Sequence, residues 1–406
     1  MSFLCREPRT SRGIESLCCH PDDEVFRNQS EITAVSGVKE CRWEYLYRGR
    51  NGLETYLASM KSVRSIFLLA LMCLSCTPRE SVPTRTISGQ VVFEDVDAMM
   101  LLSATDSSVL VLNPSDTLLL GIYSPSGHQK FLRKGRGKYE VLNPSLSYCV
   151  HGRTLDFIDH AGFASSQPAR MFSLDLSCPE DFSSWTVTDL SWIGRSRAVS
   201  HMVNIAPGKY LAVTGRYESG TLLTLLDIRE RTYTSLDYRI PVKSEMESLA
   251  GDLVFNTSSI ALSCSGTPPR IAYACGEGKY LEILSWEGES VSSRRTIFDV
   301  VPEFRAKEKG NVEMLDKENR GLRIRAASSR LFVLYEHPVE MAEYKGYPFY
   351  YTDFVDVFDW EGNQLERLQF DIPFGDFVVT EDGRTLYTIS EDKETFEASI
   401  RRYDLS

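Results

Sequence analysis

The chain has 406 residues, a formal net charge of −11, and a hydrophobic fraction of 42%. This acidic balance argues against nucleic acid or an anionic membrane surface as the main partner. The length is ample for a large core and exceeds the usual size of one domain, so we expect two domains or one closed repeat architecture.

Residues 60–75 have the layout of a secretory signal. A short basic segment precedes an unbroken apolar run at 66–74, which is too short to span a bilayer because that needs about 20 residues. Cys76 follows directly after a serine, an arrangement that resembles the lipid-attachment site of bacterial lipoproteins, although Cys73 stands where those signals usually carry Leu. We predict a lipoprotein signal peptide with lipidation on Cys76; a buried core helix is the alternative.

Residues 1–59 precede this signal and show no sustained period of 2 or 3.6. Because an export signal normally begins a chain and Met60 is placed to be an initiator, we interpret 1–59 as a disordered, over-extended N-terminal extension. The alternative is a cytosolic tail on a signal-anchor, against which the short apolar run argues. Residues 76–84 are then a lipid-anchor linker and 85–406 the folded domain.

The folded part is rich in short strand patterns broken by turn residues. One element recurs six times: a strand that ends in an apolar or aromatic residue plus Asp or Ser, before a turn. Six units averaging about 56 residues, each with room for four strands, predict an all-β, six-bladed β-propeller. The six copies lie at 120–124, 171–175, 223–227, 281–285, 356–359 and 400–404.

The ends of the chain indicate a closed ring. The last unit stops one strand short of a blade, and 86–93 supplies a spare strand that we expect to pair into it, which would remove exposed sheet edges. Blades pack face to face, so strands such as 118–123 are near-continuous apolar runs. The excess segments 303–319 and 344–351 are expected to be loops on the rim.

Four positive charges are concentrated in six residues after the first unit. Two glycines free the backbone there, so this loop is a candidate binding site for a carboxylate, sulfate or phosphate. The alternative is a solvated turn between blades whose glycines serve geometry. The candidate residues are Arg133, Lys134, Arg136 and Lys138.

The insert 344–351 is a second candidate for binding. Exposed aromatic rings mark contacts with proteins or carbohydrates, because they provide a large contact area at low entropic cost. Burial against the propeller side is the alternative. The candidate interaction surface is Tyr344, Tyr347, Phe349 and Tyr350.

Polar residues of the innermost strands provide a third candidate, in the central channel. His151, His201, Asn204 and Asn256 are the best constellation there, and the alternative is that they satisfy one another in a wet channel. No histidine pair has the i,i+4 spacing of a metal site, and no Gly-x-Ser-x-Gly elbow or phosphate loop occurs. We therefore predict no catalytic residue, no metal and no cofactor.

Four cysteines follow Cys76, too few for a disulfide scaffold. Cys264 and Cys275 fall on consecutive predicted strands and are close enough in the pattern to form a bridge. Two ordinary buried thiols are the alternative.

Three stretches resemble the TolB-like six-bladed propeller lipoproteins of Gram-negative bacteria. The segment 131–140 is similar to the family's Gly-rich junction after the first blade, with Lys138 and Tyr139 departing from its Pro-Gly; 330–371 resembles the fifth blade, and 377–405 the closing blade. The resemblance implies the fold and an envelope location, and transfers no activity.

The function expected from these observations is a non-catalytic binding or protein-interaction propeller. We expect it to be a monomer, lipid-anchored on the periplasmic side of the outer membrane, with an envelope protein, small ligand or glycan as partner and no nucleic acid. A lactonase-like or glycan-active hydrolase that uses the channel is the alternative, and a ligand sensor whose insert 303–351 closes over its ligand is a third reading.

Overall fold

The structure of the protein is a computed structural model. Cys76, Asn256 and Cys264 lie outside the described residues, so lipidation, one channel residue and the disulfide stay predictions. The described residues are 82–406 except 115, 143, 160–168, 194–197, 216–221, 242–257, 263–268, 277, 289, 302–303, 307–311, 315–319, 337–339, 345–346, 393–394 and 396.

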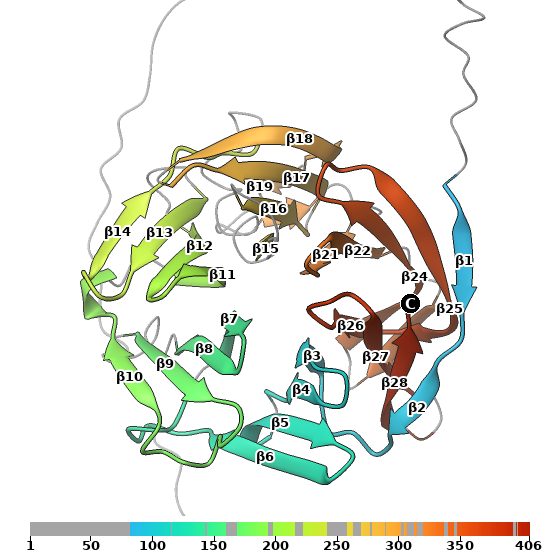
Figure 1. The fold of residues 1–406 in the computed structure, drawn as a ribbon, viewed down its shortest axis with the longest axis horizontal. Coiled ribbons are helices and arrows are strands. Elements are labelled where there is room, and N and C mark those ends of the chain that lie inside the picture. The colour runs from blue at the N-terminus through green and yellow to red at the C-terminus, as the bar shows by residue number, and fades with distance from the viewer. Residues whose placement is uncertain are drawn as a thin grey trace, which may run out of the picture. The chain divides into compact units, whose positions relative to one another are not determined.

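Six sheets surround one axis within the unit Glu80–Ser406, so the predicted six-bladed β-propeller is confirmed (Figure 1). In each blade the first strand along the chain lies nearest the axis. The first blade contains β3 (Met100–Ala104), β4 (Val109–Leu112), β5 (Leu118–Ser124) and β6 (Gly127–Arg133), and the second contains β7 (Pro144–His151), β8 (Thr154–Asp159), β9 (Arg170–Asp175) and β10 (Thr186–Asp189). The third blade contains β11 (Ala198–Ala206), β12 (Lys209–Gly215), β13 (Leu223–Asp227) and β14 (Thr232–Ser235), and the fourth contains β15 (Ser258–Leu262), β16 (Arg270–Cys275), β17 (Lys279–Trp286) and β18 (Val291–Val300). The fifth blade contains β21 (Arg320–Ala326), β22 (Arg330–Glu336), β24 (Tyr347–Asp359) and β25 (Gln364–Phe374), and the sixth contains β26 (Asp376–Val379), β27 (Thr385–Glu391) and β28 (Ala398–Asp404). A 3-10 turn, η1 (Ser191–Ile193), lies between the second and third blades.

The N-terminal part of the domain closes the ring, as the sequence predicted. β2 (Gln90–Phe93) pairs antiparallel with β28 and completes the sixth blade. The spare segment is split, however, because β1 (Thr84–Ile87) pairs in parallel with β25 of the fifth blade. Gly89 lies at the crossing between the two blades, where an added Cβ would be 2.5 Å from Cζ of the buried Tyr403.

The two excess segments contain strands, which corrects the expectation of rim loops. β19 (Phe304–Ala306) and β20 (Val312–Met314) form a small hairpin. β23 (Glu340–Tyr344) pairs with the first half of the long β24, so the aromatic insert lies in a β-hairpin that extends the fifth blade. Aromatic residues favour extended backbone, so the composition that suggested an exposed surface also favours a strand.

The recurring sequence element is the third strand of every blade: β5, β9, β13, β17, β24 and β28. These strands are covered on both faces; in β17, for example, the side chains from Tyr280 to Leu284 are all buried. The glycines of the two Trp-Glu-Gly turns have positive φ, +79° at Gly288 and +81° at Gly362, which side chains rarely adopt. Gly383, at φ +73°, lies in the hairpin turn between β26 and β27.

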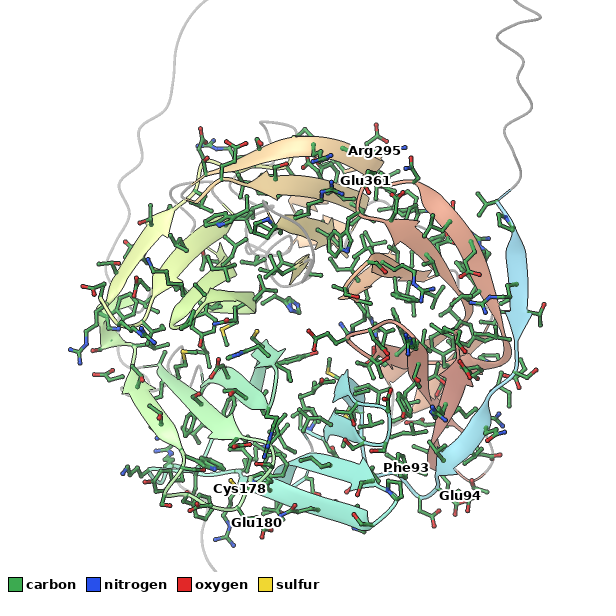
Figure 2. The ribbon with its side chains drawn as sticks, viewed as in Figure 1. Phe93, Glu94, Cys178, Glu180, Arg295 and Glu361 are labelled. Carbon is green, nitrogen blue, oxygen red and sulfur yellow. The ribbon has the colours of Figure 1, made fainter. Side chains whose placement is uncertain are left out.

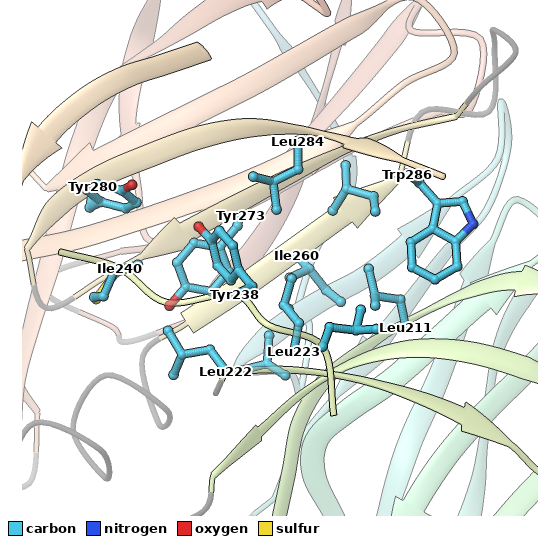
Figure 3. Packing of buried hydrophobic residues seen from close by; sticks show 14 residues of the cluster. Leu211, Leu222, Leu223, Tyr238, Ile240, Ile260, Tyr273, Tyr280, Leu284 and Trp286 are labelled. Carbon is cyan, nitrogen blue, oxygen red and sulfur yellow. The ribbon is translucent and has the colours of Figure 1, made fainter. Parts of the chain in front are cut away.

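The core is divided into six apolar clusters, one at each contact between neighbouring blades. Figure 3 shows the cluster between the third and fourth blades, where Leu211 and Leu223 meet Ile260 and Tyr273. On the rim, Arg295 Nη1 of the fourth blade donates to the carbonyl of Glu361 in the fifth at 3.0 Å (Figure 2). In the described part of the chain, no helix has the length and apolar character required to cross a membrane.

Candidate functional site

The innermost strands β3, β7, β11, β15, β21 and β26 surround the propeller axis (Figure 1). Polar side chains on these strands face neighbours from other blades across the channel. They come from residues far apart in the sequence, and therefore only ring closure brings them together.

Strand β21 carries two arginines toward the axis and the sixth blade. Leu322 and Ile324 point into the apolar cluster between the fourth and fifth blades. Side chains alternate along a strand, so Arg323 and Arg325 take the opposite face. The side chain of Arg325 remains 19% exposed, and its guanidinium donates to the carbonyls of Phe377 at 3.1 Å and Leu101 at 3.4 Å.

Asp376, at the start of β26, is the carboxylate that both arginines approach. Its side chain is 2% exposed, and its Oδ2 accepts the backbone N–H of Leu101 at 2.9 Å. Its Oδ1 lies 3.3 Å from Arg323 Nη1 and 3.5 Å from Arg325 Nη2. Strong charge-assisted hydrogen bonds are typically about 2.7–2.9 Å long. The positive charge of Arg325 is therefore only loosely matched by Asp376.

Arg325 acts electrostatically on two further polar side chains, which belong to other blades. Tyr148 belongs to β7 of the second blade and His201 to β11 of the third. Burial raises the pKa of Tyr148 and outweighs the opposing effect of Arg325, so the hydroxyl of Tyr148 stays protonated at pH 7. Burial, with the positive charge of Arg325, lowers the pKa of His201 to about 4, so its imidazole is neutral at pH 7.

This arrangement, which we call the axial cluster (Tyr148, His201, Arg323, Arg325 and Asp376), favours an anion. Arg325 supplies a fixed positive charge, and the Tyr148 hydroxyl and the neutral His201 imidazole each supply one hydrogen-bond donor. Charges at partly buried side chains are screened less than charges in bulk water, so each contact is worth more here. A carboxylate matches a guanidinium in shape and charge.

His151, the second predicted channel histidine, belongs to another hydrogen-bond group at the end of β7. Its Nε2 lies 2.6 Å from Oδ2 of Asp156, which also accepts the Tyr210 hydroxyl at 2.6 Å. Burial opposes ionisation of Asp156, but hydrogen bonds from His151, Ser173 and Tyr210 outweigh it and lower the pKa of this carboxyl. The imidazole of His151 is 39% exposed.

The predicted channel constellation is therefore divided between two groups. His201 belongs to the axial cluster and His151 to the pair with Asp156. The side-chain amide of Asn204 donates to the carbonyl of Ala206 at 3.0 Å and supports the bulge at the end of β11. Asn256 lies outside the described residues.

The basic loop binds a carboxylate of its own. The N–H of Gly137 donates to Oε2 of Glu140 at 2.7 Å, and an added Cβ on Gly135 would collide with that carboxylate. Arg133, Lys134, Arg136 and Lys138 are all exposed on the outside of the loop. Anion binding there stays a prediction, and the groups available for it are the basic side chains.

The aromatic insert gives less information. Tyr344, Tyr347, Phe349 and Tyr350 lie in β23 and β24, but their side chains lie outside the described set, so the interaction surface stays a prediction. Tyr351 is 8% exposed, which agrees with the alternative of burial for this ring.

The sequence interpretation missed Tyr148, Arg323, Arg325 and Asp376. A signal for the arginines exists, because charged residues that alternate with Leu322 and Ile324 are unusual on an innermost strand. In the described part of the chain, no group of three or more His, Cys, Asp and Glu side chains lies close enough together to hold a metal ion.

No protein-family model matches the chain, and no curated protein matches it. Solved structures are similar at low identity. The β-propeller domain of Myceliophteria_thermophila Cps50 (Swd1) is 12% identical over 78% of this chain and 100% of that chain, with a TM-score of 0.41. The RRP9 WD40 repeats are 10% identical (80% and 99% covered, TM-score 0.40), and YCF48 bound to D1 peptide is 8% identical (80% and 98% covered, TM-score 0.38). Because the identities and TM-scores are this low, no ligand or partner of these proteins is assigned to this chain.

Proposed function

We propose that this protein is a non-catalytic binding propeller whose axial cluster holds the carboxylate of a ligand. The observation that carries the proposal is the guanidinium of Arg325, which is 19% exposed on an innermost strand and only loosely matched by Asp376 at 3.5 Å. Tyr148 and His201, on which Arg325 acts, supply the hydrogen-bond donors that a carboxylate requires. Small organic acids and the C-terminus of a partner protein share this chemistry.

Thermal unfolding of the protein with carboxylate probes tests the proposal. Succinate and a tetra-alanine peptide with a free C-terminus represent the two sources, and the same peptide with an amidated C-terminus is the matched control. The probe that represents the true source of the carboxylate, succinate or the free peptide, is expected to raise the Tm by several degrees at saturation. Equal shifts from the free and amidated peptides, with none from succinate, would contradict it.

Variants assign the effect to the channel. Arg325→Met should weaken binding on the order of tenfold to a hundredfold, and Tyr148→Phe should weaken it less without removing a charge. Arg384→Gln, at a side chain 75% exposed on the sixth blade, is the control and should bind as the wild type does. A Tyr148→Phe protein that is folded and binds with unchanged affinity would speak against the site.

The pH dependence of binding follows from His201. A bound carboxylate favours the imidazolium and raises the pKa of His201 from about 4 toward its usual range. Affinity should therefore increase on the order of tenfold between pH 7 and pH 5 for one coupled proton. His201→Gln should bind at pH 7 and lose this increase.

The location belongs to the same proposal. The signal at 60–75 and Cys76, together with the resemblance to TolB-like lipoproteins, support a lipid anchor in the bacterial envelope, on the periplasmic side of the outer membrane. Incorporation of a labelled palmitate analogue into the wild type but not into Cys76→Ala, with translation from Met60, tests the anchor.

One observation favours a hydrolase as the second candidate function. His151, held by the buried Asp156 and partly exposed, has the orientation of a general base. A hydrolase would release acid from a lactone or ester probe in a pH-stat, and loss of that release in His151→Ala would assign it to this histidine.

A further inference from the structure

An aromatic pair, of which one ring is exposed, lies beside the basic loop on the rim between the first and second blades. Phe182, in the loop between β9 and β10, stacks on Tyr139 with ring centroids 5.3 Å apart and an interplanar angle of 22°. At 48% exposure, Phe182 is the most exposed large apolar side chain among the described residues. Figure 2 labels Cys178 and Glu180 of the same loop, at the rim beside the first blade.

Positive charges border this pair. Nζ of Lys138 lies 4.7 Å from the centroid of the Tyr139 ring, on which Phe182 also stacks. Arg133 and Arg136 are exposed in the same loop. We call these five residues the basic–aromatic surface: Arg133, Arg136, Lys138, Tyr139 and Phe182.

The surface is held rigidly from below. Arg170 donates to the carbonyls of Gly137 at 3.1 Å and Glu140 at 2.7 Å, and to the buried carboxylate of Asp159 at 2.9 Å. Trp185 packs edge-on against Phe182, at 5.0 Å between centroids. A loop that is already ordered loses little entropy when a partner binds.

Aromatic rings and arginines are the side chains that contribute most to protein interfaces. Contacts with Tyr139 and Trp185 still leave 48% of Phe182 exposed, and an apolar ring as exposed as this is better explained by a partner than by folding alone. The neighbouring cations favour acidic groups on that partner.

The size of the partner segment follows from electrostatic screening. Charges separated by more than about 8 Å are largely screened at physiological salt. A short acidic segment therefore senses mainly the local cations, whereas an extended polyanion or an anionic membrane also faces a chain of net charge −11.

We propose that the basic–aromatic surface docks an acidic segment of a partner protein, with an aromatic or large apolar side chain of that segment packed on Phe182. Glu180 and Asp181 directly precede Phe182 in the chain, and Asp181 Oδ1 already accepts the Ser183 hydroxyl at 2.6 Å. These carboxylates repel the acidic groups of the partner, which therefore point toward Arg133, Arg136 and Lys138. This surface is separate from the axial cluster.

Fluorescence anisotropy with three labelled peptides tests the docking. The probes are Glu-Glu-Phe-Glu-Glu, the same peptide with Ala for Phe, and the same peptide with Lys for every Glu. The protein is expected to bind the first at least tenfold more tightly than the second, and not to bind the third. Affinity for the first should fall as salt increases.

Variants separate the two parts of the surface. Phe182→Ala should remove the preference for Phe over Ala and keep the salt dependence. Arg136→Glu with Lys138→Glu should weaken both acidic peptides at least tenfold. Arg384→Glu, an exposed charge reversal on another blade, is the matched control. All the altered side chains are exposed, so the variants should keep a Tm close to that of the wild type.

Two results would overturn the proposal. One is equal affinity of the protein for the Phe and Ala peptides; the other is a loss of affinity in the surface variants that is no larger than the loss in Arg384→Glu. Binding to vesicles of phosphatidylglycerol without binding to the acidic peptides would assign the surface to membranes instead and would equally overturn it.

Discussion

Replacing Asp376 with Ala is expected to lower the free energy of unfolding by about 3–5 kcal/mol, because it removes a buried carboxylate on which the N–H of Leu101 and two arginines converge. Asp376 connects three blades: it accepts the N–H of Leu101 in the first, belongs to the sixth, and faces Arg323 and Arg325 of the fifth. Urea denaturation measures the change.

Two variants control for this effect. Asp376→Asn keeps an acceptor for the Leu101 N–H and loses only the charge, so its cost should be smaller, about 1–3 kcal/mol. Arg153→Ala breaks an exposed pair with Asp175 at 3.7 Å and should change stability by less than about 1 kcal/mol. Equal losses in Asp376→Ala and Arg153→Ala would show that the carboxylate does not hold the blades together.

Gly89→Ala is expected to destabilise the closure of the ring by about 1–3 kcal/mol, the usual cost of overpacking. The new methyl group would meet three atoms of the Tyr403 ring at 2.5–2.9 Å, and that ring is fully buried against Phe370. Because β2 must move outward to relieve the contact, limited proteolysis near Phe93 should become faster in this variant.

Gly375→Ala is the matched control for this substitution. An added Cβ there has one neighbour, Cε1 of Tyr351, at an ordinary 3.8 Å. Its stability and cleavage rate should remain those of the wild type. If Gly89→Ala behaves as Gly375→Ala does, the contact with Tyr403 does not limit where β2 can lie.

The architecture was predictable because one strand of every blade has the same surroundings. The third strand is covered on both faces and ends in a turn, so its apolar run and its terminal Asp or Ser recur along the chain. The division of the closing segment at Gly89 was not predictable. Its cause, contact with Tyr403, depends on a residue at the other end of the sequence.

The axial cluster escaped prediction for a related reason. A histidine stands out in a sequence poor in histidines, whereas Arg325 and Asp376 are two of many charged residues. Their role depends on the blades that they face, because Arg325 reaches the carbonyl of Leu101, 224 residues earlier in the chain. The loop of Glu140 is the opposite case: its glycines were evident in the sequence, but the carboxylate of Glu140 that lies against Gly135 and Gly137 was not predicted.

Ring closure has a consequence for the order of folding. Arg401 reaches the carbonyl of Gly89 across 312 residues, and β2 finds its partner only when β28 exists. Contacts at such sequence separation make folding slow, since a long loop must close before they form. During synthesis β2 therefore waits, with an open edge, for the last strand of the domain. The interval in which the chain is exposed to aggregation lasts until β28 has been made.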